Sequence, residues 1–216
     1  MTTGVRALLR LLLVLDNVLY RYTSLAAVRY GGGLHPKHRL TAYHDFFARH
    51  IGDGERVLDI GCGLGVVDGD VVTRTGAFVT GVDHDAAAIA HAQQRYRHDR
   101  LRFVVGDAWT AAGGQTFDVV VLSNVLEHLD DRVEFLTTIR MKIAPRRLLI
   151  RVPLFERDWR VPLKAELGVD YRLDPTHRIE YREREFRDDV RRGGFAVLET
   201  EIRWGEIWAV CAPDRG

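Results

Sequence analysis

The sequence predicts an α/β domain, built on a doubly wound, seven-stranded, mostly parallel sheet with one antiparallel edge strand, after an N-terminal helical extension. Two observations lead to this prediction. Short runs rich in β-branched and aliphatic residues alternate with helical patterns, as they do where helices cover both faces of a parallel sheet. The first such run also leads directly into Gly61, Gly63 and Gly65. Glycines in a strand-to-helix turn let backbone approach a ligand closely.

The expected elements follow one another along the chain. Strands are expected near residues 56–61, 77–83, 101–106, 117–122, 146–152, 195–203 and 206–212, and helices near 65–75, 85–97, 130–143 and 180–192. Asp85 suits an N-cap, as does Asp130 or Asp131, and Gly193-Gly194 ends the last helix. The turn at 203–205 predicts a hairpin between the last two strands, which makes one edge antiparallel.

The chain of 216 residues fits one domain, residues 35–216, after the extension at residues 1–30. A further helix is predicted to begin at Pro36, with Tyr43, Phe46 and Phe47 on its apolar side. The stretch 153–178 is too long for an ordinary connection between a strand and a helix, and it carries aromatic residues and many charges. Long connections of this kind are often functional, so an ordered lid or substrate arm is predicted there.

Composition narrows the possible partners. The formal net charge is +1, from 31 basic and 30 acidic residues, so no global field would attract nucleic acid or an anionic membrane. Cys62 and Cys211 are the two cysteines, and their positions support neither a disulfide framework nor a metal cluster. A reducing, cytoplasmic location is therefore predicted.

Residues 5–22 predict an amphipathic helix with a wide apolar side rich in leucine. Its polar stripe consists of Arg6, Arg10, Asn17 and Arg21. These residues and Asp16 interrupt the apolar run, which argues against a membrane span or a signal peptide. Two interpretations stay open. The helix packs on the domain or on a second subunit in a dimer, or it attaches to a membrane surface, because a basic stripe opposite leucines is also the interfacial pattern.

An acidic residue, Asp83, ends the second predicted strand about twenty residues beyond the glycines, where a carboxylate can accept both ribose hydroxyls. The dinucleotide fingerprint would place its third glycine at Val66, but the chain has glycines at 61, 63 and 65 instead. This spacing favours a different adenosine ligand over a nicotinamide dinucleotide.

Four segments in this order carry a family resemblance. They are VLDIGCGLG at 57–65, GVDHD at 81–85, VGDAW at 105–109 and FDVVVLSNVLEHL at 117–129. Together they resemble the class I (Rossmann-like) S-adenosylmethionine-dependent methyltransferases of the small-molecule or glycan type. The resemblance covers about residues 40–212. It implies S-adenosyl-L-methionine as cofactor and transfer of a methyl group to a small-molecule or sugar-like acceptor, at oxygen rather than nitrogen, in natural-product or glycan biosynthesis.

The resemblance also implies a set of cofactor-binding residues. They are Tyr43, Asp59, Gly61, Cys62, Gly63, Gly65, Asp83, His84, Asp107, Ala108, Trp109, Ser123 and Asn124. Within this set Asp59 would contact the amino group of the cofactor, Asp83 the ribose and Asp107 the adenine. Simple core packing is the alternative interpretation for Trp109, since tryptophans are commonly buried.

His177 and His128 are the candidate catalytic residues, because an alcohol acceptor needs a base to remove its proton. The alternatives are that His177 bonds the lid to the domain and that His128 supports the cofactor or its loop. No metal is assigned, since the pair His35 and His38 lacks further ligands at a supporting spacing. Two other functions stay open: an NAD-dependent oxidoreductase, and a catalytically idle subunit that binds S-adenosylmethionine, for which the unusual segment 67–70 leaves room.

Overall fold

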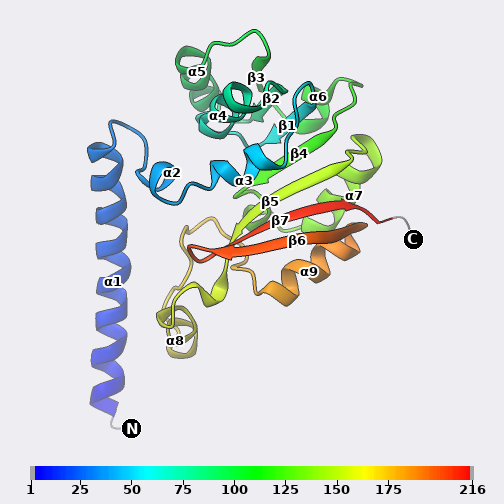
Figure 1. Ribbon diagram of the computed structural model, residues 1–216. Coiled ribbons are helices and arrows are strands. Elements are labelled where there is room, and N and C mark those ends of the chain that lie inside the picture. The colour runs from blue at the N-terminus through cyan, green and yellow to red at the C-terminus, as the bar shows by residue number, and fades with distance from the viewer. Residues whose placement is uncertain (1–2, 215–216) are drawn as a thin grey trace.

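Seven strands form one sheet in the order β3-β2-β1-β4-β5-β7-β6, in a computed structural model that describes residues 3–214 (Figure 1). The strands are β1 (Arg56–Ile60), β2 (Phe78–Asp83), β3 (Leu101–Val105), β4 (Val119–Ser123), β5 (Arg147–Pro153), β6 (Phe195–Arg203) and β7 (Glu206–Pro213). The first five run parallel. The order reverses between β1 and β4, and in sheets of this kind the ligand crevice lies at the carboxyl ends of the strands beside such a switch point.

The antiparallel strand is β7, which pairs with β5 on one side and with β6 on the other. It therefore lies one place in from the edge, and the edge strand β6 runs in the direction of the first five. Trp204 and Gly205 make the predicted hairpin turn, with φ of 54° and 73°. Two consecutive residues with positive φ match the twist of the strands they join.

Helices cover both faces of the sheet (Figure 1). One face is packed by α3 (His44–Arg49), α4 (Val66–Thr75) and α5 (Ala86–Arg95), and the other by α6 (Ala108–Ala112), α7 (Arg132–Lys142) and α9 (Glu183–Arg192). The central strands are apolar on both faces for this reason: in β5, Leu149 packs with the first set and Leu148 with the second.

The predicted strands and helices are confirmed with small shifts of their ends. Asp85 caps α5, accepting from the backbone N–H groups of Ala87 and Ala88. The single helix predicted from Pro36 is wrong. The chain breaks it at Ala42, where φ is 52°, into α2 (Lys37–Leu40) and α3. The break turns the aromatic residues of α3 into the core beside Trp208.

The stretch 153–178 contains a short 3₁₀ helix, η2 (Phe155–Arg157), then α8 (Arg160–Leu167) and a loop. The N-terminal helix α1 (Thr3–Tyr30) is longer than predicted and stands beside the domain, against α8 (Figure 1). Leu13 is its one buried residue, packed with Leu167 and Val169. By length and composition alone, α1 could cross a membrane, a test that signal sequences also pass.

Candidate active site

The glycine turn between β1 and α4 presents open backbone to the crevice. Gly61, Gly63 and Gly65 all have positive φ, of 76°, 53° and 68°. A Cβ atom added at Gly63 would meet nothing within 4 Å, whereas one at Gly65 would lie 2.5 Å from the ring of Phe103. Gly63 therefore leaves room for a ligand, and Gly65 allows β3 to pack closely under the turn.

Asp83, at the end of β2, holds this turn in place. Its Oδ2 accepts a hydrogen bond from the backbone N–H of Gly63 at 2.9 Å, and its Oδ1 accepts one from the N–H of Asp85 at 2.9 Å. A carboxylate has about four acceptor sites, so two remain for a ligand. The predicted residue His84 is exposed beside it. The carboxylate thus lies next to the open backbone of Gly63, where a ribose diol would be recognised.

Two buried carboxyl groups lie beneath the turn. Asp59, in β1, is 3% exposed, and Asp68, in α4, is 1% exposed. Among the described residues, no donor reaches Asp59 Oδ1 or either Asp68 oxygen. Burial, and then the neighbouring Asp68, raises the pKa of Asp59 well above its usual value, and burial raises the pKa of Asp68 to about 7. One carboxyl of the pair therefore keeps a proton, which supplies the missing donor.

Cys62 lies within the turn and is half-buried with a free thiol. Burial, followed by the negative charges of Asp68 and Asp59, raises the pKa of this thiol. The group is therefore neutral and is a weak nucleophile.

Ser123 ends β4 and Asn124 follows it, at the same edge of the sheet. Asn124 has a φ of 60°, and its buried Oδ1 has no donor among the described residues. Arg151 Nη1 donates to Ser123 Oγ at 3.2 Å, and the guanidinium also makes two hydrogen bonds to Glu206, at 2.6 and 2.5 Å. Asn124 thus offers an unpaired acceptor to the crevice.

Tyr43, just before α3, is buried against Arg151. The Arg151 guanidinium lies 3.8 Å from the centre of its ring, and the Tyr43 hydroxyl is 2.6 Å from His38 Nδ1. Burial raises the pKa of the Tyr43 hydroxyl, so it stays protonated and available as a donor. Arg151 was missed by the sequence reasoning, although an arginine within the apolar strand LLIRVP is an unusual residue for a buried position.

The third segment of the resemblance forms the start of α6. Asp107 is the N-cap: it accepts from the N–H groups of Thr110 and Trp109, each at 2.8 Å, and from Thr110 Oγ1, which lowers its pKa. Ala108 is buried in the core. The Trp109 ring is half-buried and lies 5.8 Å from the ring of Phe135, a contact that fits the core-packing interpretation and leaves stacking on the cofactor open.

The two candidate catalytic histidines meet, although 48 residues separate them. His128 belongs to a short 3₁₀ helix, η1 (Leu126–His128), and His177 to the loop after α8. Their ring centres are 4.6 Å apart, with perpendicular planes. Burial, then the charge of His177, lowers the pKa of His128. Beside them Glu127 is fully buried, neither of its oxygens has a donor among the described residues, and burial raises its pKa to about 7.

Each histidine is held through its Nδ1 atom. His177 Nδ1 lies 2.9 Å from Glu180 Oε1, and His128 Nδ1 lies 2.8 Å from Thr176 Oγ1. Glu180 is itself buried and accepts from Arg157 Nη1 at 2.7 Å, a contact that the sequence did not predict. The three titratable groups Glu127, His128 and His177 place their nearest donor atoms within 4.8 Å of one another, which is close enough to share a metal ion.

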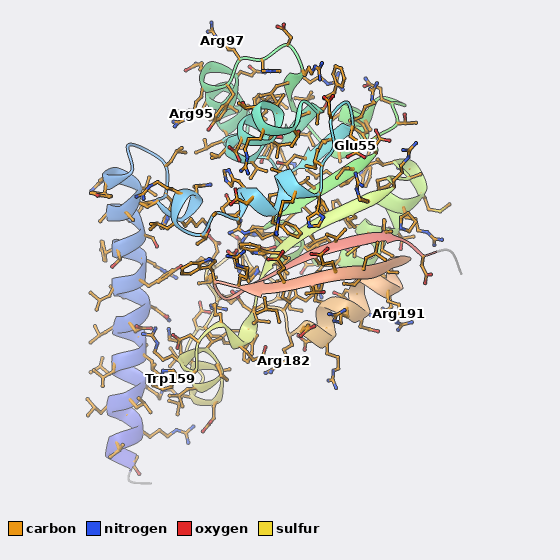
Figure 2. All side chains as sticks on the ribbon, in the orientation of Figure 1. Glu55, Arg95, Arg97, Trp159, Arg182 and Arg191 are labelled. Carbon is orange, nitrogen blue, oxygen red and sulfur yellow. The ribbon has the colours of Figure 1, made fainter. Side chains whose placement is uncertain are left out.

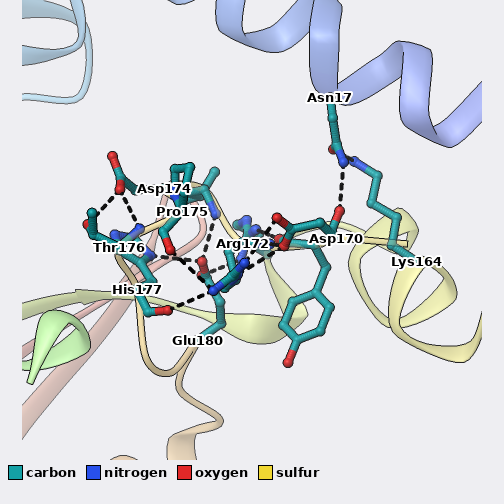
Figure 3. A network of polar contacts seen from close by, with 12 residues as sticks. Asn17, Lys164, Asp170, Arg172, Asp174, Pro175, Thr176, His177 and Glu180 are labelled. Atoms are coloured by element: carbon teal, nitrogen blue, oxygen red, sulfur yellow. Dashed lines mark hydrogen bonds and ion pairs between the residues drawn. The ribbon is translucent and has the colours of Figure 1, made fainter. Parts of the chain in front are cut away.

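A network of polar contacts ties this loop to the N-terminal helix (Figure 3). Asn17 of α1 donates to the backbone oxygen of Asp170 at 2.6 Å. The Asp170 carboxylate pairs with Arg172, whose Nη1 donates to the backbone oxygen of His177 at 3.3 Å. The position of His177 therefore depends on contacts that reach as far as α1.

A switch point with glycine backbone and a carboxylate beside it is typical of α/β enzymes that bind a nucleoside-containing cofactor. A model of the methyltransferase domain family matches residues 34–200, and the chain belongs to that family. Its fold is that of the class I S-adenosylmethionine-dependent methyltransferases, and its cofactor is S-adenosylmethionine.

Relatives and solved structures agree with this assignment. The chain is 34% identical over 110 residues to the mitochondrial ubiquinone biosynthesis O-methyltransferase of Schizosaccharomyces pombe, covering 49% of this chain and 40% of that protein. It is 31% identical over 186 residues to the ubiquinone biosynthesis O-methyltransferase of Methylobacterium sp. strain 4-46, covering 75% and 72%. The chain spans about half the length of most of the curated relatives it matches.

The magnesium protoporphyrin IX methyltransferase of Synechocystis PCC 6803, solved with bound SAH, has the same fold with a TM-score of 0.64. The two proteins are 18% identical, and the match covers 81% of this chain and 83% of that one.

The crevice fits the cofactor. Backbone at Gly63 and Gly106 is open, since an added Cβ atom would meet nothing within 4 Å at either position. Asp59 and Asn124 each present a buried oxygen without a donor among residues 3–214. Unpaired acceptors of this kind suit the ammonium and sulfonium charges of S-adenosylmethionine, because a buried acceptor costs free energy until it is paired.

Proposed function

We propose that the chain is an S-adenosylmethionine-dependent methyltransferase that methylates an oxygen atom of a small-molecule acceptor. The observation that carries the proposal is the Asp83 carboxylate beside the open backbone of Gly63, at the switch point of the sheet. The printed names of the relatives, which are O-methyltransferases, support oxygen as the acceptor atom.

The bound cofactor supplies a methyl group on a positively charged sulfur. The chain's own residues then have to bind, orient and exclude water, because methyl transfer needs an in-line approach of the acceptor. We assign the ribose to Asp83, the amino group to Asp59 and the adenine to the start of α6 at Asp107. The acceptor enters beside Asn124 and the histidine pair, at the end of β4.

The loop after β5 favours a neutral acceptor, such as a phenol or a sugar hydroxyl. Its arginines are held in ion pairs within the protein: Arg157 with Glu180, Arg160 with Asp158, and Arg172 with Asp170. A guanidinium in such a pair has little left to offer an anionic substrate. The sugar-like acceptor expected from the sequence stays compatible with this arrangement.

Calorimetry of the full chain with S-adenosylmethionine, S-adenosylhomocysteine and NAD separates the first alternatives. We expect micromolar binding of the two adenosyl compounds and no heat with NAD, and the reverse result would make the protein an oxidoreductase. Methyl transfer from labelled cofactor to panels of phenols and sugars then tests the enzyme itself. Tight binding without transfer to any acceptor would favour the catalytically idle subunit.

We also propose that α1 lies on a membrane surface, at the cytoplasmic side. Its leucines and valines are largely exposed, for example Leu12 at 52% and Leu19 at 66%. Side chains project from α1 on the side away from the domain (Figure 2). Its one acid, Asp16, pairs inward with Arg160 and Lys164 of α8, and Arg10 of the polar stripe donates to the backbone oxygen of Leu167, so the side away from the domain is mainly apolar. Such a side suits the apolar boundary of a lipid surface, and the central ion pairs favour a helix lying flat over one crossing the bilayer.

Vesicle flotation tests the placement of α1. Leu12→Glu with Leu19→Glu is expected to abolish flotation with vesicles of phosphatidylglycerol and phosphatidylcholine. The matched control, Met141→Glu with Leu198→Glu, adds the same charge at residues that are 75% and 65% exposed on α7 and β6, and it should float like the unchanged protein. No flotation of the unchanged protein, together with a dimer in light scattering that the Leu12/Leu19 pair disrupts, would make α1 a subunit contact instead.

A further inference from the structure

We propose that Glu127, His128 and His177 bind a divalent transition-metal ion beside the methyl acceptor. One carboxylate and two imidazoles converge here from η1 and the loop after α8, with donor atoms within 4.8 Å of one another. Mixed nitrogen and oxygen donors of this kind suit Zn²⁺ and Mn²⁺. The sequence alone assigned no metal, because these ligands come together only in the fold.

The hydrogen bonds leave a lone pair on the correct atom of His177. Glu180 is paired with Arg157 and accepts from the N–H of Leu173 at 2.7 Å, so its carboxylate oxygens act as acceptors. His177 Nδ1 therefore carries the proton that bonds to Glu180 Oε1, and Nε2 is unprotonated in the neutral ring. A histidine that donates one ring N–H to a carboxylate is the usual orientation of a metal ligand.

The hydrogen bonds of Thr176 identify the protonated ring nitrogen of His128 in the same way. Thr176 has one hydroxyl proton, which it donates to Asp174 Oδ1 at 2.6 Å. Thr176 Oγ1 therefore accepts from His128 Nδ1, and Nε2 of His128 is also the atom with the lone pair. The two imidazoles thus reach the cluster in the same tautomer, each oriented by an acid: Glu180 directly, and Asp174 through Thr176.

Glu127 supplies the negative charge. It is 0% exposed, and neither carboxyl oxygen has a hydrogen-bond donor in the part of the chain that the structure describes. A buried carboxyl group in this state is costly to ionise, and a bound cation would remove most of that cost.

The other charges around Glu127 leave room for a cation. Arg151, from β5, faces it but is held by both oxygens of Glu206. Lys37, from α2, acts on Glu127 only through a weak electrostatic effect, and no hydrogen bond joins them among the described residues. Glu180 adds a second negative charge close to the cluster. Glu180 is paired with Arg157 and Arg151 with Glu206, so the buried Glu127 carboxyl is the charge that a divalent ion would balance.

Three protein ligands leave coordination positions for the acceptor, and this step rests on the proposed function. A hydroxyl bound there has a lowered pKa and loses its proton to solvent. Its oxygen then forms a C–O bond to the methyl carbon while the C–S bond breaks, and the electron pair of that bond stays on the sulfur. The histidines would hold the metal and would not act as bases.

The site is tested by calorimetry of the metal-stripped full chain with ZnCl₂ and MnCl₂, without cofactor or acceptor. We expect one ion per chain at micromolar affinity or tighter. Glu127→Gln, His128→Ala and His177→Ala should each weaken binding at least about 100-fold, and Glu180→Gln about 10-fold. The controls His91→Ala, on the exposed side of α5, and His35→Ala should bind like the unchanged protein.

Thermal unfolding provides the second measurement, because an ion that binds only the folded state raises Tm. Zn²⁺ should raise the Tm of the unchanged protein and leave that of Glu127→Gln unchanged. No binding by the unchanged protein at millimolar metal, or equal binding by Glu127→Gln and His177→Ala, overturns the proposal. Metal binding without any methyl transfer would instead count against the proposed function alone.

Discussion

The carboxyl groups of Asp59 and Asp68 interact directly beneath the glycine turn, although one belongs to β1 and the other to α4. Both are almost fully buried, and no other donor among residues 3–214 reaches the Asp68 oxygens. Like charges in a shared buried site cannot both ionise at low cost. The pair therefore holds a proton at the carboxyl that we assign to the cofactor amino group, and it makes stability depend on pH.

Asp68→Asn should stabilise the protein at alkaline pH. Burial raises the pKa of Asp68 from 3.8 to about 7, so the folded state holds a proton that the unfolded state loses. The contribution of Asp68 to the free energy of unfolding is fully present below about pH 4. It decreases as pH rises towards 7 and is constant above that. An asparagine cannot ionise, and its amide can donate to Asp59. We expect a gain of about 1 to 3 kcal/mol at pH 8 and almost none at pH 4 in urea unfolding.

The control for this measurement is Asp99→Asn, which makes the same chemical change at an exposed residue. It should leave stability unchanged at both pH values. A lower Tm of Asp68→Asn at pH 8 would mean that the ionised pair is stabilising and that the shared proton does not exist.

Gly63→Ala should weaken cofactor binding without unfolding the protein. An alanine with left-handed φ costs about 1 kcal/mol, and the added methyl group meets no protein atom within 4 Å. It does fill the space where backbone faces the proposed ligand. Gly54→Ala is the matched control, since Gly54 has a φ of 73° and equally open surroundings in the turn before β1. We expect Gly63→Ala and Gly54→Ala to lower Tm by similar amounts. In calorimetry, only Gly63→Ala should lose affinity for S-adenosylmethionine, by at least tenfold.

Asp83→Asn should reduce affinity for S-adenosylmethionine by about 10- to 100-fold, the loss expected for hydrogen bonds to a charged group. An asparagine has one acceptor oxygen in place of two, so it cannot hold Gly63, Asp85 and a ribose diol together. Asp85→Asn is the control, because asparagine caps a helix as well as aspartate does and α5 stays capped. Equal affinity of Asp83→Asn and the unchanged protein would remove the ribose assignment.

The sheet could be predicted from the sequence because the signals for its strands and turns lie within short stretches of the chain. Each strand is a short apolar run, the hairpin is marked by its turn, and the caps of the helices lie next to them. Ala42 shows the limit of such reasoning. An alanine favours a helix, and its left-handed conformation arises from the packing of α3 under the sheet, which no neighbouring residue indicates.

The site was predictable where ligand contacts come from backbone turns and strand ends, as at Gly63 and Asp83. It was not predictable where side chains pair across the fold. Arg151 on β5 pairs with Glu206 on the neighbouring β7, although the two residues are 55 positions apart in the chain. Asp68 contacts Asp59 only because α4 packs back over β1. His128 and His177 were each recognised, but their contact and its link to Glu127 exist only once the loop after α8 is placed.

Asp16→Ala should release α1 from α8 and leave the α/β domain folded. Lys164 is 8% exposed, and its Nζ donates to Asp16 Oδ2 and Asn17 Oδ1 at 2.7 Å each. Removing the carboxylate leaves a largely buried ammonium without its counter-charge, which costs about 3 kcal/mol. This cost exceeds the stabilisation from the small apolar contact of α1 around Leu13.

Hydrogen exchange should therefore speed up throughout α1 and in α8, while the exchange of β1 and β4 stays unchanged. Asp188→Ala is the control, since it removes an exposed pair with Arg191 that contributes at most about 1 kcal/mol. Because Asn17 also holds Asp170, and the chain continues through Arg172 to His177, the loop at 170–177 should exchange faster as well. Faster exchange in α1 with an unchanged loop would show that the helix and the histidine loop are independent.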